Sequence, residues 1–153
     1  MKATPDQHDP DWLRYPETVL SFATRPPVEI DLRKIPSDSA LAQLRAAGFG
    51  EPFAIMTAFD PGGRNLSAAE NEKRKRQLDR RVSSAGYSFV QVACYSPDRS
   101  HCESSLAVIM SQKKALALAR EMEQVAIFWF DGRRFWILGA IAETDPLMLP
   151  RSS

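Results

Sequence analysis

The hydrophobic positions of this chain repeat with two different periods, and the shorter period predicts strands. Residues 28–32 (VEIDL) alternate apolar and acidic side chains, which is typical of a strand with one buried face. Residues 53–59 are almost all apolar, which favours a central strand covered on both faces. Two further pairs of apolar runs, each separated by a turn signal, predict hairpins: 89–95 with 102–110, and 125–130 with 134–140.

Capping residues and the longer period predict four helices. Pro16 suits a first helical turn, and Ser37 and Ser111 are favourable N-caps. Ser67 followed by Glu70 forms a capping-box pattern at the start of the longest helix. The predicted helices are 16–23, 37–47, 67–86 and 112–122.

The resulting order, α-β-α-β-α-β-β-α-β-β, combines hairpins with β-α-β units. It predicts a single α+β domain over residues 16–142, with a mixed sheet of about five to six strands and helices packed on it. Residues 1–15 are expected to be a flexible lead, from which Trp12 and Tyr15 could dock on the domain. Residues 143–153 are expected to form a frayed tail.

Composition excludes some classes of function. The net charge is +1, so any attraction to nucleic acid must come from a local patch. The apolar runs are too short to cross a bilayer and the first residues lack the apolar core of a signal peptide, so we expect a cytoplasmic protein without membrane contact. Cys94 and Cys102 fall on neighbouring predicted strands. Free thiols are expected in a reducing cytosol, although the sequence leaves their pairing open. Two Cys and two His lack zinc-ligand spacing, so we expect no metal site and no cofactor.

Polar residues interrupt the apolar face of the longest predicted helix. Leu78, Val82 and Ala85 define a buried stripe, and extending it toward the N-terminus reaches Arg74 and Asn71. A helix N-terminus that follows a central strand is a common place for ligands, especially anions. The alternative is structural, with both side chains tying down the 57–67 loop, including an ion pair of Arg74 with Asp60 or Glu103.

The same helix carries a run of basic residues that suits a nucleic-acid backbone. A solvated helix face is the favoured interpretation, because Glu72 and Asp79 interrupt the run and the net charge is close to neutral. The candidate nucleic-acid residues are Lys73, Lys75, Arg76, Arg80 and Arg81.

Several segments resemble a bacterial family known as domain of unknown function 3293. Residues 53–61 (FAIMTAFDP), followed by Asn71, Arg74 and Leu78, resemble its strand ending in Thr-Ala-aromatic-Asn-Pro and its following helix. Residues 103–108 (ESSLAV), 115–119 and 124–128 (QVAIF) resemble its later strand, helix and strand. The resemblance covers about 53–138. Asp60 departs from it, standing where Asn is usual, and the turn 96–101 lacks the usual Gly and Trp.

The resemblance implies a small bacterial α/β domain of unknown activity, with a polar set that could converge at one end of the sheet. A buried carboxylate at Glu103 near Arg74 would have to be fully hydrogen-bonded to be tolerated. The residues carried over from the family pattern are Thr57, Asp60, Asn71, Arg74, Glu103 and Gln124.

Three functions remain open from the sequence. The favoured one is a non-catalytic domain that binds a small ligand or a protein partner. The second is an enzyme, a hydrolase or a nucleic-acid-processing protein, with Glu103 or Asp60 as general base and Arg74 as electrostatic clamp. The third is binding of nucleic-acid backbone through residues 73–81. No Walker loop, GxSxG elbow or HExxH motif supports an enzyme, and the oligomeric state is open.

Overall fold

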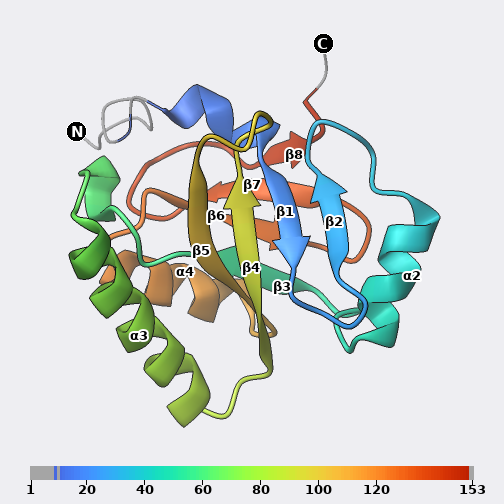
Figure 1. Ribbon diagram of the computed structural model, residues 1–153, viewed down its shortest axis with the longest axis horizontal. Helices are drawn as coiled ribbons and strands as arrows, with labels where there is room; N and C mark the ends of the chain where they lie inside the picture. Colours follow the sequence, from blue (N-terminus) through green and yellow to red (C-terminus); the bar gives the residue numbers. More distant parts are fainter. Residues whose placement is uncertain (1–8, 10, 152–153) are drawn as a thin grey trace.

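One antiparallel sheet forms the frame of the molecule (Figure 1). The computed structural model describes residue 9 and residues 11–151. In this part of the chain the sheet has eight strands in the order β2-β1-β4-β5-β3-β6-β7-β8, and every neighbouring pair is antiparallel. The strands are β1 (Val19–Phe22), β2 (Val28–Asp31), β3 (Phe53–Met56), β4 (Phe89–Tyr95), β5 (Cys102–Val108), β6 (Ala126–Phe130), β7 (Phe135–Gly139) and β8 (Leu147–Leu149). The α+β class is confirmed, whereas the expected five to six strands and the expected mixed sheet are wrong.

The sheet is antiparallel because no helical crossover joins neighbouring strands, and the crossovers through α3 and α4 each skip one strand. α3 (Ala68–Ser84) connects β3 to β4, but β5 lies between those two strands. α4 (Gln112–Glu121) connects β5 to β6, but β3 lies between them. Strands joined by such a crossover run in the same direction, yet each has only antiparallel neighbours. The prediction of a mixed sheet assumed that such strands would pair directly.

The expected helix over residues 16–23 is wrong. The chain instead forms a short 3-10 helix, η1 (Trp12–Glu17), which contains Pro16, and then enters β1. Val19, Leu20 and Phe22 are buried, and β1 pairs with β2 on one side and β4 on the other. Pairing on both sides outweighs the local helix signal of Pro16, because it satisfies the backbone and buries apolar side chains together.

The expected frayed tail is wrong at Leu147–Leu149, which form β8 against β7. Leu149 is 1% exposed, whereas its neighbour Met148 is 49% exposed. The alternation of Leu147, Met148 and Leu149 is the pattern of a strand with one buried face.

The other predicted helices are confirmed. α2 (Asp38–Ala46) is capped by Ser37, α4 by Ser111, and α3 by a reciprocal capping box between Ser67 and Glu70. Both predicted hairpins, β4–β5 and β6–β7, also form. No helix in the described residues combines the length and apolar character that a bilayer crossing requires.

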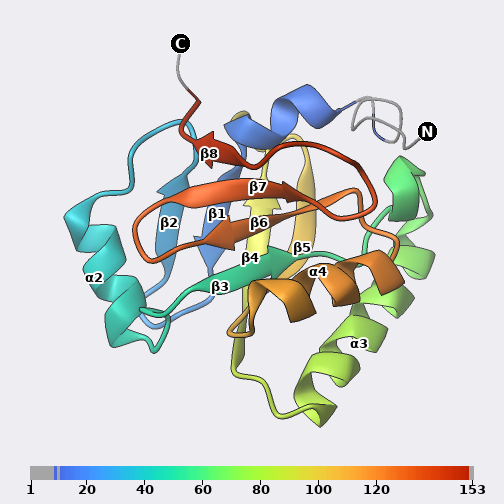
Figure 2. The ribbon, with the colours of Figure 1, turned by 180° about the vertical axis from the view of Figure 1, so that it is seen from behind.

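The sheet curls, so that β1 and β2 lie on one side of the molecule and β6, β7 and β8 on the other (Figures 1 and 2). The inner core fills the space between these halves and centres on Phe53, whose ring contacts Phe22, Phe49, Phe130 and Phe135. The outer core lies between the opposite sheet face and helices α3 and α4. One end of the curled sheet therefore remains as a mouth beside η1.

Candidate functional site

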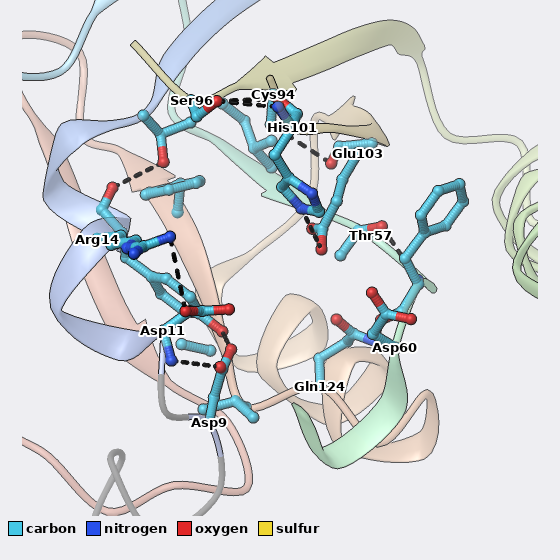
Figure 3. Close-up of a pocket in the computed structure, with 18 of the residues that line it drawn as sticks. Asp9, Asp11, Arg14, Thr57, Asp60, Cys94, Ser96, His101, Glu103 and Gln124 are labelled. Atoms are coloured by element: carbon cyan, nitrogen blue, oxygen red, sulfur yellow. Dashed lines mark hydrogen bonds and ion pairs between the residues drawn. The ribbon is translucent and has the colours of Figure 1, made fainter. Parts of the chain in front are cut away.

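A cavity of about 320 Å³ lies at this mouth, between η1, the start of β5 and the loop after β3 (Figure 3). Apolar side chains from the inner face of the sheet, among them Ile55 and Phe128, line part of its wall. Figure 3 shows Asp9, Asp11 and Arg14 on one side of the cavity, facing Thr57, Asp60, Glu103 and Gln124 on the other. Four of the six residues predicted from the family pattern thus meet around one cavity.

The loop after β3 is held in place by Thr57 and Asp60. The Thr57 hydroxyl donates to the carbonyl oxygen of Ser104 at 2.8 Å and accepts from the amide of Phe59 at 3.1 Å. Asp60 has a left-handed backbone with a φ of 46°, and its Oδ1 accepts from the amide of Leu66 at 2.9 Å. The loop is therefore closed by its own side chains.

Asn71 and Arg74 lie behind this loop and do not line the cavity. The buried Asn71 accepts from the Asp60 amide and donates to Asp60 Oδ1, both at 2.9 Å. Arg74 donates from Nε to the carbonyl oxygen of Ala58 at 2.6 Å and from Nη2 to that of Met122. Arg74 forms no ion pair with Asp60 or Glu103, so the expected pairing is wrong. Both side chains instead tie α3 to the loop, as in the structural alternative.

Gln124 follows α4 and immediately precedes β6. Its side-chain amide donates from Nε2 to the carbonyl oxygens of Phe59 and Met122, each at 3.2 Å. Gln124 is 5% exposed, and its Oε1 has no hydrogen-bond partner among the described residues. Because Gln124 lines the cavity, the remaining acceptor is available to a bound molecule.

Among the carboxyl groups that line the cavity, Glu103 has a raised pKa. Its side chain is 29% exposed, and its Oε1 lies 3.6 Å from Nε2 of His101. Burial raises the pKa of the Glu103 carboxyl, with further contributions from Asp60 and Asp9, whereas His101 opposes the increase. The arrangement places a carboxyl group with a raised pKa on the cavity wall.

The cavity wall formed by η1 together with Asp9 and Asp11 could not be predicted from the sequence. The Tyr15 hydroxyl donates to the Asp9 carboxylate, and burial, reinforced by Asp9, raises the Tyr15 pKa above its usual range. Asp11 lies 3.9 Å from Arg14 at the exposed rim. The only available signal was the expectation that Trp12 and Tyr15 dock on the domain. Their rings do pack against the inner core.

The two thiols are free and lie on opposite faces of the sheet. Cys94 pairs in register with Glu103, whereas Cys102 pairs with the next residue, Tyr95. The Cys94 thiol donates to Ser105 Oγ at 3.4 Å, and burial raises the pKa of Cys94 to about 12. Cys94 is therefore an uncharged part of the cavity wall. Among the described residues, no three His, Cys, Asp or Glu side chains gather closely enough to hold a metal ion.

The basic residues of α3 lie outside the cavity, and three of them are ion-paired. Lys75 Nζ lies 2.8 Å from Asp79, Arg76 lies 3.9 Å from Glu72, and Arg81 lies 2.7 Å from Glu121. The pairs involve three of the five candidate nucleic-acid residues, Lys75, Arg76 and Arg81, and leave Lys73 and Arg80 without an ion pair among the described residues. The observation favours the solvated helix face.

The fold and the site together define a small antiparallel α+β domain with a cavity at one end of its sheet. Residues 56–127 match the model of the family described as "Protein of unknown function (DUF3293)". The match confirms the resemblance and contains all six residues of the predicted polar set: Thr57, Asp60, Asn71, Arg74, Glu103 and Gln124. The comparisons with curated proteins and with solved structures found no match.

Glu103→Gln is expected to raise the stability of the fold at neutral pH. A raised folded-state pKa means that the ionised carboxylate destabilises the folded state above that pKa. This destabilisation disappears as the pH falls to the ordinary value of 4.5. The variant should therefore melt at a higher temperature than the parent at pH 7, and the difference should shrink toward pH 4. Thermal melts across this range test the prediction, with the exposed Glu51→Gln as control. A difference that grows on acidification would contradict it.

Proposed function

We propose that this domain is a non-catalytic binding protein that takes up a small organic molecule in the cavity beside η1. The carrying observation is the cavity itself, about 320 Å³ at the mouth of a curled sheet, with apolar side chains and a few convergent polar groups. Ligand sites typically have this volume, this lining and this position in a β fold. A cytoplasmic location belongs to the same proposal.

The hydrogen bonds behind the cavity support a preformed site. Asn71 fixes the loop that carries Thr57 and Asp60 by two hydrogen bonds, and Arg74 fixes it by one, while its second bond goes to Met122 at the end of α4. A wall held in this way loses little conformational freedom when a ligand binds, which favours affinity. The polar network of α3 thus serves the cavity indirectly, as a support.

An enzyme remains the second candidate, because Glu103 and His101 form a close pair on the cavity wall. A carboxyl with a raised pKa beside an imidazole suits general acid–base chemistry, in a hydrolase or a nucleic-acid-processing protein. Arg74 does not suit the role of electrostatic clamp, since its guanidinium is directed to two backbone carbonyls outside the cavity. The enzyme hypothesis therefore keeps an acid–base pair, Glu103 and His101, but lacks the cationic clamp for which it required Arg74.

A cavity-filling substitution tests the proposal. Ala126 lies on β6 and lines the cavity, so Ala126→Leu should occupy part of the space, at a cost of about 1–3 kcal/mol where neighbouring side chains must adjust. A library of small organic fragments is screened by amide chemical shifts in NMR spectra. We expect fragments that shift the amides of Thr57, Glu103 and Gln124 in the parent protein and lose this effect in the variant.

Ala93→Leu provides the matched control. Ala93 lies on β4 next to Cys94 and therefore on the opposite face of the sheet, where it does not line the cavity. This variant should bind the same fragments as the parent. The proposal fails when no fragment shifts the cavity amides, or when Ala126→Leu binds every fragment as tightly as the parent does.

A further inference from the structure

We infer that the natural ligand of the cavity is an organic cation, a protonated amine or a guanidinium, held by the acceptor oxygens of Glu103, Asp60 and Gln124. The inference rests on the proposed binding function and adds the chemical class of the ligand. It follows from the direction of each hydrogen bond around the cavity. On the wall that faces η1, several acceptor oxygens receive no hydrogen bond from the described residues.

Gln124 gives the most specific indication. Its Nε2 lies 3.2 Å from two backbone carbonyl oxygens, those of Phe59 and Met122, and only an N–H group can bond to both. This fixes the orientation of the amide, so the oxygen is the atom left for the cavity (Figure 3). An acceptor that no described residue engages, on a side chain that is 5% exposed, is available to a donor from a ligand or from water.

Asp60 adds a second acceptor beside it. Both of its side-chain hydrogen bonds, from the Leu66 amide and from Asn71 Nδ2, end on Oδ1. Its Oδ2 forms no hydrogen bond with any described residue, and Asp60 lines the cavity. Fixing Oδ1 by two donors orients the carboxylate and leaves its second oxygen available.

Glu103 supplies the third acceptor and makes the charge of the site negative. The cationic groups that line the cavity are Arg14, which lies beside Asp11 at the rim, and His101, when protonated, beside Glu103. The lining carboxylates outnumber them: Asp9, Asp11, Glu17, Asp60 and Glu103. A bound cation would relieve the mutual repulsion of Glu103, Asp60 and Asp9, which contributes to the raised pKa of Glu103.

The remaining wall favours an organic cation. The inner-face side chains of Ile55 and Phe128 line the same space, and Phe59 also lines it. Such side chains accommodate a hydrocarbon or aromatic body, and ring faces also attract ammonium and guanidinium groups. The expectation from sequence that the N-terminus of α3 binds an anion loses its basis, because Ser67 and Glu70 already cap that terminus.

Isothermal titration with probes of different charge tests the inference; three of the probes share a phenylalkyl body, and agmatine, a linear alkyl guanidinium, is the fourth. The cations are 2-phenylethylamine and agmatine, the neutral probe is 2-phenylethanol, and the anion is 3-phenylpropionate, all at pH 7. We expect the cations to bind at least about 10-fold more tightly than the alcohol, since charge-assisted hydrogen bonds are about twice as strong as neutral ones. Binding of the anion should be undetectable.

Glu103→Gln keeps the shape of the side chain and removes its charge. It should weaken the binding of 2-phenylethylamine about 10-fold or more and leave that of 2-phenylethanol unchanged, whereas the exposed Glu51→Gln should change neither. Equal affinity for amine, alcohol and anion in the parent protein would overturn the inference, as would unchanged amine binding in a folded Glu103→Gln variant.

The outcomes separate the two proposals. When the alcohol or the anion binds in the cavity and the amines do not, the cation inference fails and the binding function stands. When no probe binds and no fragment shifts the cavity amides, both fail. The comparison of the probes on the parent protein decides the charge preference even where Glu103→Gln does not fold.

Discussion

Arg74→Ala is expected to lower the free energy of unfolding by about 3 kcal/mol, because it removes the charged donor of two backbone carbonyls, of which that of Met122 keeps Gln124 Nε2 as a second donor. Those carbonyls belong to Ala58, in the loop after β3, and to Met122, at the end of α4. A single side chain of α3 therefore fastens two other segments, and its loss frees both. Urea denaturation monitored by circular dichroism measures the change.

Arg80→Ala is the matched control on the same helix. Arg80 is exposed and forms no ion pair with the described residues, so its removal should change stability by less than about 0.5 kcal/mol. A loss below about 1 kcal/mol for Arg74→Ala would show that the guanidinium is dispensable for the fold.

Leu149→Ala should also lower the free energy of unfolding by about 3 kcal/mol, the ordinary effect of truncating a fully buried leucine. Leu149 lies in β8 opposite Phe135 and belongs to the inner core around Phe53. Its position seven strands away from β2 in the sheet does not make it peripheral, because the sheet curls and brings its two ends toward the same core.

Met148→Ala tests this assignment at the neighbouring position. Met148 is 49% exposed, so its truncation should change stability by no more than about 0.5 kcal/mol. Thermal or urea unfolding of both variants measures the alternation directly. Similar small effects at the two positions would mean that the segment behaves in solution as the frayed tail expected from the sequence.

Local signals predicted the helices well. The capping box of Ser67 and Glu70 and the caps at Ser37 and Ser111 are formed by residues three positions apart, so the sequence contains the whole interaction. The same holds for the hairpin turns, such as that at Gly132, whose φ of 107° suits glycine.

The elements that the sequence did not predict depend on pairing between segments that are distant in the chain, and no local pattern in the sequence indicates this pairing. Val19 and Leu20 are buried because β1 lies between β2 and β4, a neighbourhood that no local pattern around Pro16 reveals. Likewise β8 exists because β7 offers it an edge. These are cases in which tertiary packing overrides a local preference.

The sequence predicted which residues belong to the candidate site, but it predicted the roles of only some of them. Asn71 and Arg74 do stand on the core-facing side of α3, as their spacing from Leu78 predicted, and they serve structure there. Glu103 and Gln124 meet at one cavity because β5 and β6 flank β3, which is a property of strand order. Asp9 joins them from the opposite side by a contact with Tyr15 that no periodicity could indicate.

The placement of β3 has a consequence for biosynthesis. Its two sheet partners, β5 and β6, are both encoded downstream, so the ribosome releases the apolar segment Phe53–Met56 well before either partner exists. Until Cys102–Val108 and Ala126–Phe130 have emerged, four consecutive core residues have no strand beside them, a situation that exposes nascent chains to misassociation. Chaperones should accordingly capture ribosome-bound fragments most strongly when β3 has emerged from the ribosome and β5 and β6 have not.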